Sequence, residues 1–291
     1  MTLPEAYGGS DADKLYSVVQ MEELARAGFS GIGYGLHSEI VAPYILHYGT
    51  EAQKQKYLPK LASGEMVGAI AMSEPAAGSD LQGVKTTAML QPDGTYLING
   101  SKTFITNGWH ADLVILVAKT DPAAGAKGTS LFLIERGMPG FEKGKRLKKL
   151  GLKAQDTSEL FFDNVKVSAD QLLGGTAMQG KGFICLMEQL PWERLQIAIG
   201  GIAAAQADFS AFAAGGIELG VETGVSAGAV SGLVERGRFH ATAHGCEGLH
   251  LRRDLPAHAH HRQPQHHERH PLHSRHPNAC EPDRSRHRRH A

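Results

Sequence analysis

The sequence predicts an α+β fold in which helical segments flank a middle domain of short strands. Apolar side chains recur with a period near 3.6 from residue 13 to residue 58, which is typical of helices. At Met66 the period changes to 2, and after Leu172-Leu173-Gly174 the helical period returns. We therefore expect a partial helical domain at 1–65, a β-domain at 66–175, the first helix of a helical bundle at 176–206, and a tail at 207–291.

Three helices are predicted in the first part. Residues 13–26 form an amphipathic pattern, and Gly28 is a suitable C-terminal stop. Residues 32–48 form a second, mostly apolar helical segment. The segment Thr50-Glu51-Ala52-Gln53 has the form of a capping box, in which a hydroxyl and an amide satisfy the first free N–H groups of a helix. We expect this third helix to end near Leu58-Pro59.

The middle part is predicted to form an antiparallel, barrel-like sheet. Pro92-Asp93-Gly94 and Asn99-Gly100 suit tight hairpin turns between strands. Many short strands at regular spacing favour such a sheet over a doubly wound fold, and no glycine-rich dinucleotide fingerprint is present. The expected strands are Val67–Met72, Thr86–Leu90, Thr95–Ile98, Lys102–Thr106, Leu113–Lys119, Ser130–Glu135 and Glu159–Val167.

The last helix is expected at residues 183–206, with Pro191 inside it. An internal proline has no N–H to donate to the carbonyl four residues earlier, which here belongs to Met187. We therefore expect a kink at this point. Glu193 lies two residues beyond the kink, among apolar residues that would raise its pKa by desolvation.

The tail has a different composition from the rest of the chain. Thirteen of the sixteen histidines lie at or beyond His240, and Lys181 is the last lysine. A segment with so few apolar side chains cannot offset the entropy of ordering it, so we expect disorder in this tail. The abrupt change in the type of basic residue indicates that the reading frame of the gene changes after Gln206. Histidine-rich tracts can bind metals and arginine-rich tracts nucleic acids, but the spacing here matches neither a metal site nor a stacking surface.

Composition excludes several other classes. The 291 residues have zero formal net charge and are 42% apolar, which favours a globular core over a nucleic-acid partner. Three cysteines without short spacing indicate neither a zinc site nor a disulfide framework, so a reducing, cytoplasmic location is expected. The N-terminus lacks the pattern of a signal peptide, and no apolar stretch reaches the roughly 20 residues of a membrane span.

Two motifs carry the functional prediction. The first is Ala71-Met72-Ser73-Glu74-Pro75-Ala76-Ala77-Gly78-Ser79-Asp80, an apolar strand that enters a turn with hydroxyl groups and a carboxylate. Such turns often approach ligands closely, although a plain strand connection has the same appearance. The second is Lys102-Thr103-Phe104-Ile105-Thr106-Asn107-Gly108. Together they resemble the flavin-binding core of the acyl-CoA dehydrogenase family.

The resemblance extends from about Leu3 to Gln206. Residues 47–59 resemble the helical N-terminal domain of the family, and residues 151–167 are similar to the end of its β-domain. It implies a helical, β, helical order of domains, with FAD and the acyl thioester between the β-domain and the second helical part. The cofactor would be held by Met72, Ser73, Ser79, Phe104, Ile105 and Thr106.

Each of these residues also has a simpler interpretation. Ser79 can act as a turn cap together with Asp80, and Thr106 can be an ordinary strand threonine. Phe104 and Ile105 can belong to the core.

The catalytic base is also inferred from the resemblance. Leu190-Pro191-Trp192-Glu193-Arg194-Leu195 is similar to the helix that carries the base in the long-chain and isovaleryl branches, and Glu193 falls on the base position. Substrate contacts would come from Ser79, Pro191, Trp192 and Arg194. The simpler alternatives are a surface glutamate at 193 and a structural ion pair at 194.

The implied reaction is α,β-desaturation of an acyl-CoA, in which Glu193 removes a proton from Cα and hydride passes from Cβ to the flavin. The family further implies an electron-transferring flavoprotein as acceptor and a homotetramer. A different hypothesis is a non-catalytic remnant that cannot hold FAD stably. It follows from the expectation that the helices before Leu3 and the final helices of the bundle are absent.

Overall fold

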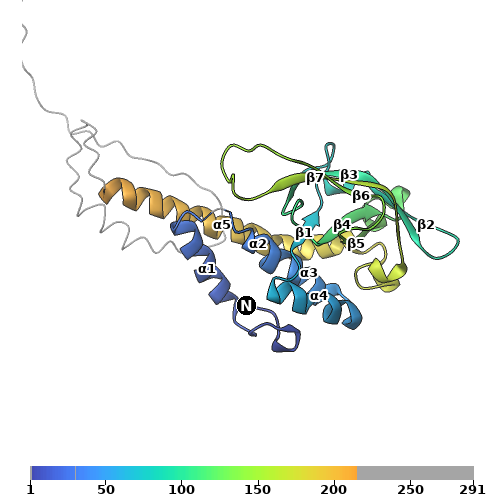
Figure 1. The fold of residues 1–291 in the computed structure, drawn as a ribbon, viewed down its shortest axis with the longest axis horizontal. Coiled ribbons are helices and arrows are strands. Elements are labelled where there is room, and N and C mark those ends of the chain that lie inside the picture. Colours follow the sequence, from blue (N-terminus) through green and yellow to red (C-terminus); the bar gives the residue numbers. More distant parts are fainter. Residues whose placement is uncertain (1, 30, 215–291) are drawn as a thin grey trace, which may run out of the picture. The chain divides into compact units, whose positions relative to one another are not determined.

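The computed structural model describes residues 2–29 and 31–214, and it confirms the α+β prediction (Figure 1). A helical N-terminal part is followed by a seven-stranded sheet and one long helix, α5 (Gly182–Ala214). This helix continues eight residues past the end expected at 206. The rest of the expected tail, from residue 215 onward, lies outside the described residues.

The N-terminal helices are α1 (Lys14–Arg26), α2 (Tyr34–Leu36), α3 (Ala42–Tyr48) and α4 (Glu51–Ser63), with a π-helical turn, η2 (His37–Val41), between α2 and α3. The capping box of α4 is confirmed, because the Thr50 hydroxyl accepts from the N–H of Gln53 at 3.2 Å and the Gln53 side chain accepts from the N–H of Thr50 at 3.0 Å. The predicted end at Leu58-Pro59 is wrong. Pro59 lies inside α4, because Leu58 and Leu61 are buried in the core and hold the last turn in place.

The sheet has the strand order β1-β4-β2-β3-β7-β6, with β5 paired to β4 off this path. Its strands are β1 (Gly68–Ala71), β2 (Thr87–Leu90), β3 (Tyr96–Thr106), β4 (Leu113–Lys119), β5 (Thr129–Glu135), β6 (Phe141–Arg146) and β7 (Thr157–Val167). Most neighbours are antiparallel, as expected, but β4 pairs in parallel with both β1 and β2. The sheet is therefore mixed, because the connection from β1 to β4 is long and no tight turn forces the two strands to run in opposite directions.

Asn99-Gly100 does not form the predicted hairpin. Instead β3 runs through this point, and the register against β7 shifts between Ile98 and Gly100, as in a β-bulge. Gly100 adopts φ 152°, and a Cβ there would collide with Thr86 on the adjacent chain segment. The dipeptide therefore marks a bulge that a side chain would disrupt. Strand β6 has little apolar alternation and was not predicted from the sequence.

The core lies on both faces of the sheet, and β4 is buried along its whole length. Its residues Leu113, Ile115 and Val117 face a cluster formed with the N-terminal helices and the start of α5. The alternate residues Val114 and Leu116 pack instead with β3 and β7. A strand buried on both faces is a continuous apolar run, which agrees with the sequence of this segment.

Candidate functional site

The two sequence motifs lie side by side. The N–H of Thr103 donates to the carbonyl of Ser73 at 3.0 Å, so the loop that follows β1 runs against β3. The Lys102 ammonium donates to the carbonyl of Met72 at 3.0 Å. These two bonds hold Met72 and Ser73 beside the segment that contains Phe104 and Thr106, as one wall of a common site requires.

A buried ion pair fixes this arrangement. Lys102 Nζ lies 2.8 Å from Glu74 Oε1, and the two side chains are 0% and 4% exposed. Glu74 also accepts from the N–H of Lys85 at 2.6 Å and from the N–H and hydroxyl of Thr86 at 3.0 and 2.6 Å. Each carboxylate oxygen therefore has at least one donor, and the loop is bound to both β3 and the segment before β2.

The pKa values of the pair reflect its surroundings. Burial opposes ionisation of Glu74, but hydrogen bonds from Lys102 and Thr86 outweigh it and lower the pKa of this carboxyl. Burial lowers the pKa of Lys102 to about 8, against the opposing effect of Glu74. Sequence reasoning missed the pair. The available signals were a lysine within an apolar strand and a glutamate in the turn, but nothing in the sequence joins them.

The predicted flavin contacts differ in exposure. Phe104 is 69% exposed and adopts φ 58°, which is unusual for a bulky residue, whereas Ile105 is 2% exposed and belongs to the core. Thr106 is half-buried and pairs with Thr157 of β7. Ser79 is exposed in a loop where Asp80, rather than Ser79, accepts the capping bond from the N–H of Gln82.

Glu193 lies on α5 against the buried phenol of Tyr44, which belongs to α3. The Tyr44 hydroxyl donates to Glu193 Oε1 at 3.0 Å, and Tyr44 is 0% exposed. Burial raises the pKa of Glu193, while the Tyr44 hydrogen bond and the charge of Arg194 partly oppose that rise. Burial and the Glu193 charge also raise the pKa of Tyr44, so the phenol remains a donor. Glu193 is therefore not a solvated surface residue.

Polar links join the helix of Glu193 to the strand that leads into the first motif. Gln196 Nε2 donates to the carbonyl of Glu39 in η2 at 3.1 Å. In the same turn, His37 Nδ1 accepts from the N–H of Gly68 at 3.0 Å, and its Nε2 lies 2.9 Å from the carbonyl of Leu61. This pairing requires the proton on Nε2. The η2 turn thereby contacts both α5 and β1.

Two of the remaining predicted substrate contacts on α5 are exposed, and the ring of the third lies against α1. Arg194 and Pro191 are exposed. The ring of Trp192 lies under Lys14 Nζ at 4.6 Å from its centroid, and its Nε1 is buried without a hydrogen-bond partner among the described residues. The four residues predicted to contact substrate are Ser79, Pro191, Trp192 and Arg194, and they are not part of the lining of the cationic cavity described next.

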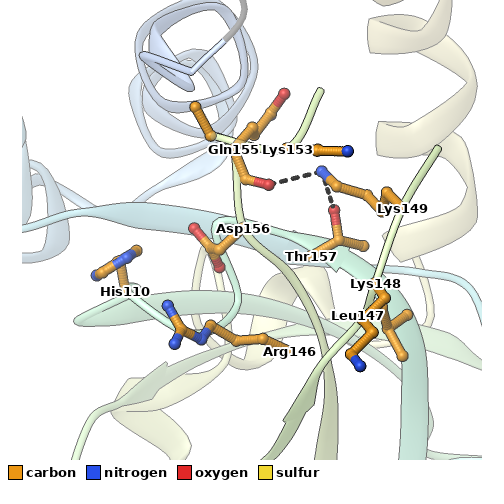
Figure 2. A pocket seen from close by; sticks show the side chains of 10 residues that line it. His110, Arg146, Leu147, Lys148, Lys149, Lys153, Gln155, Asp156 and Thr157 are labelled. Carbon is orange, nitrogen blue, oxygen red and sulfur yellow. Dashed lines mark hydrogen bonds between the residues drawn. The ribbon is translucent and has the colours of Figure 1, made fainter. Parts of the chain in front are cut away.

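A cationic cavity of about 590 Å³ lies near the end of β3, and sequence reasoning did not single it out. Figure 2 shows Arg146, Lys148, Lys149 and Lys153 around it, with His110 and Asp156 at its side. Lys149 Nζ donates to the Gln155 carbonyl at 2.6 Å and to Thr157 Oγ1 at 2.9 Å, which braces the wall. The signal in the sequence was the run of basic residues from Lys143 to Lys153.

Membrane-spanning helices and metal clusters are both absent from the part of the chain that the structure describes. None of the helices there is both long and apolar enough to cross a membrane. Within the same ranges, no three His, Cys, Asp or Glu side chains are grouped so that they could hold a metal ion.

Two family models match the part of the chain that contains the N-terminal helices and both sequence motifs. The family models "Acyl-CoA dehydrogenase, N-terminal domain" and "Acyl-CoA dehydrogenase, middle domain" match residues 1–65 and 69–165. The chain belongs to the acyl-CoA dehydrogenase family.

Individual relatives support the same conclusion. The chain is 50% identical over 211 residues to the long-chain specific acyl-CoA dehydrogenase of Mus musculus, covering 72% of this chain and 48% of the relative. It is 47% identical over 208 residues to the isovaleryl-CoA dehydrogenase of Oryza sativa subsp. japonica, covering 71% and 50%. A crystal structure of an acyl-CoA dehydrogenase from Geobacillus kaustophilus superposes with a TM-score of 0.71 at 48% identity, covering 80% of this chain and 62% of that one. The chain spans about half the length of the curated relatives it matches.

Proposed function

We propose that this chain carries out, or contributes to, α,β-desaturation of an acyl-CoA thioester with FAD as cofactor. The observation that carries the proposal is the position of Glu193, a carboxylate partly buried on α5 and hydrogen-bonded to Tyr44. A base that removes a weakly acidic Cα proton works best when its pKa is close to the working pH. Burial moves the pKa of Glu193 in that direction.

The proposed flavin site is formed by Met72, Ser73, Ser79, Phe104, Ile105 and Thr106. Two observations support a planar ligand there: the adjacency of the two motifs and the exposed Phe104 ring. When bound, FAD supplies the hydride acceptor of the reaction. Ile105 would support this wall from the core, because its side chain is buried.

Glu193 is the proposed base. In its ionised form it would take the proton from the substrate Cα, and the Tyr44 hydroxyl would hold Oε1 in a fixed orientation. Arg194 and Trp192 are proposed to contact the thioester end of the substrate. Proton transfer by a positioned carboxylate is worth about 10²–10⁴ in rate.

The cationic cavity fits the phosphate groups that both acyl-CoA and FAD contain. Arg146, Lys148 and Lys153 offer several donors around one space, and charge-assisted hydrogen bonds to phosphate are strong. Binding there would depend on salt concentration, because these side chains are exposed.

The partners of the reaction are also proposals. An electron-transferring flavoprotein would accept the electrons, a homotetramer would be the assembly, and a reducing, cytoplasmic compartment would be the location. The names of the mouse and rice relatives both include the word mitochondrial. Fractionation of the native cell would decide the location directly.

The visible spectrum of the purified chain tests the proposal. We expect bound flavin, or uptake of added FAD, and bleaching of the flavin when an acyl-CoA is added without oxygen. Glu193→Gln should keep the flavin and lose the bleaching by at least 10²-fold in rate. Asp208→Asn, an exposed acid on the same helix, is the matched control and should bleach at the wild-type rate. Bleaching by Glu193→Gln at the wild-type rate would show that another group is the base.

The alternative is a remnant that cannot hold FAD. It is favoured by the exposed apolar side chains on α5, among them Ile184, Leu195 and Ile202. Such side chains are usually covered in a complete domain. A folded but colourless chain that takes up no FAD would select this alternative and reject the enzymatic function.

A further inference from the structure

A strongly basic segment, the basic loop (residues 143–155), comprises the end of β6 and the connection to β7. Strand β6 is the last in the strand order, and the connection extends outward from the sheet (Figure 1). The basic loop contains no Asp or Glu, although the whole chain has zero formal net charge. Positive charge is therefore concentrated here. Its basic residues are Lys143, Lys145, Arg146, Lys148, Lys149 and Lys153.

Most of these cations are available to a partner. Lys143 and Lys149 donate to carbonyl groups of the fold and support the loop. The others are exposed and have no carboxylate within 4 Å among the described residues; they are Lys145, Arg146, Lys148 and Lys153. Exposed charges of one sign without internal partners attract a surface of the opposite sign.

The same loop presents two leucines to solvent. Leu150 is fully exposed and Leu152 is 56% exposed. Gly151 and Leu152 adopt φ 83° and φ 41°, and a positive φ is uncommon for leucine. The backbone thus bends where both apolar side chains point away from the core. In the sequence the two leucines lie between Lys149 and Lys153, so apolar and cationic groups occupy one surface.

We propose that the basic loop docks on an anionic membrane surface, with Leu150 and Leu152 inserted at the interface and the cations beside the lipid phosphates. Protein segments that bind membrane interfaces combine apolar side chains that enter the bilayer with Lys and Arg side chains that attract anionic lipids. A nucleic acid or an acidic protein surface would satisfy the charges but leave the leucines in water. This attachment is peripheral, so it requires no membrane-spanning helix.

The leucines separate a membrane from a soluble phosphate compound. Arg146, Lys148 and Lys153 also line the cationic cavity, so lipid phosphates and soluble phosphates share one recognition chemistry. A soluble phosphate makes no use of an exposed leucine, whereas a bilayer gains binding energy by covering it. The proposal goes beyond the proposed function, because it requires neither FAD nor acyl-CoA.

Cosedimentation of the full-length chain with lipid vesicles tests the proposal. We expect binding to phosphatidylcholine vesicles with about 30% phosphatidylglycerol and little binding to phosphatidylcholine alone. Binding should fall at about 0.5 M salt, because salt screens exposed charges. A chain that fails to bind the anionic vesicles at low salt would overturn the proposal.

Leu150→Glu tests the apolar contact and should weaken vesicle binding at least about tenfold. Leu90→Glu is the matched control, because Leu90 is also 56% exposed. Leu90 pairs with Tyr96 at the start of β3, whereas the basic loop leads into Thr157 at the other end of that strand. Binding by the control should be unchanged, and circular dichroism would verify that both variants are folded. Binding that Leu150→Glu leaves intact would show recognition of phosphate alone and overturn the membrane contact.

Lys148→Glu tests the charge and should weaken binding about tenfold. Lys127→Glu changes an exposed lysine in the segment before β5 and should have no effect. Leu150→Trp reports insertion directly: vesicles with brominated acyl chains should quench its fluorescence beyond the quenching of Trp109 and Trp192 in the wild type. Equal quenching in the two proteins would place the loop outside the bilayer and overturn the proposal. Because no flavin is needed, failure here and failure of the proposed function are distinguishable.

Discussion

Replacement of Lys102 by methionine is the sharpest test of how the candidate flavin wall is held. Methionine has nearly the length of the lysine stem, so the packing of β3 is kept while the charge is removed. The change leaves Glu74 buried with a full negative charge, and the Met72 carbonyl loses its donor. Breaking a buried ion pair by removing one partner costs about 3–5 kcal/mol. Domains of this kind have only about 5–15 kcal/mol of stability in total.

The measurement is urea unfolding of the full chain at pH 7, followed by circular dichroism. In a thermal melt, a loss of about 3–5 kcal/mol in the free energy of unfolding corresponds to a fall in Tm of about 6–20 °C for a domain of this size. The matched control is Lys166→Met. Lys166 forms a pair of similar length with Asp93, at 2.7 Å, but the two side chains are 60% and 52% exposed. An exposed pair contributes about 0–1 kcal/mol, so this variant should unfold almost as the wild type does.

The contrast between the two variants decides the argument. If Lys102→Met lowers the free energy of unfolding by less than about 1 kcal/mol, the buried ion pair does not hold the loop after β1 in place. Glu74→Gln combined with Lys102→Met should lose less than the sum of the single changes, because neither partner is then left as an isolated charge. Where FAD binds, Lys102→Met should also weaken its binding, because the loop that contains Met72 and Ser73 loses its anchor.

Other outcomes follow from single contacts. Thr50→Ala removes the cap of α4 and should cost about 1 kcal/mol by urea unfolding, whereas Thr50→Ser, which keeps the hydroxyl, should restore most of it. Gly100→Ala should destabilise the chain, because an added Cβ would collide with Thr86 at φ 152°. This cost should exceed the small stabilisation that alanine gives by reducing the flexibility of the unfolded chain. An unchanged urea midpoint would contradict the bulge. Glu193 has a raised pKa in the fold, so its contribution to stability is full below its ordinary pKa and is lost as pH rises through the raised value. Glu193→Gln should therefore gain stability relative to the wild type as pH rises from about 4 to about 8, and a constant difference would show that Glu193 is solvated.

The periodicity and the turn residues by themselves determined much of the fold. The switch of period at Met66, the capping box at Thr50 and the apolar run of β4 each depend on neighbours close in sequence. For that reason the sequence was enough to predict them. The Asn99-Gly100 dipeptide misled the prediction, because the same residues suit a hairpin and a bulge. Only the pairing of β3 with the distant β7 distinguishes the two.

The candidate site also combines features that the sequence predicted with features that only the tertiary structure shows. The two motifs and the position of Glu193 came from the sequence, since a motif keeps its residues at fixed spacing along the chain. The Lys102–Glu74 pair, the contact of Tyr44 with Glu193 and the cationic cavity join residues far apart in sequence, and only the tertiary structure brings them together. The burial that shifts the pKa of Glu193 is likewise a property of the packed molecule, because desolvation depends on all the groups around a charge.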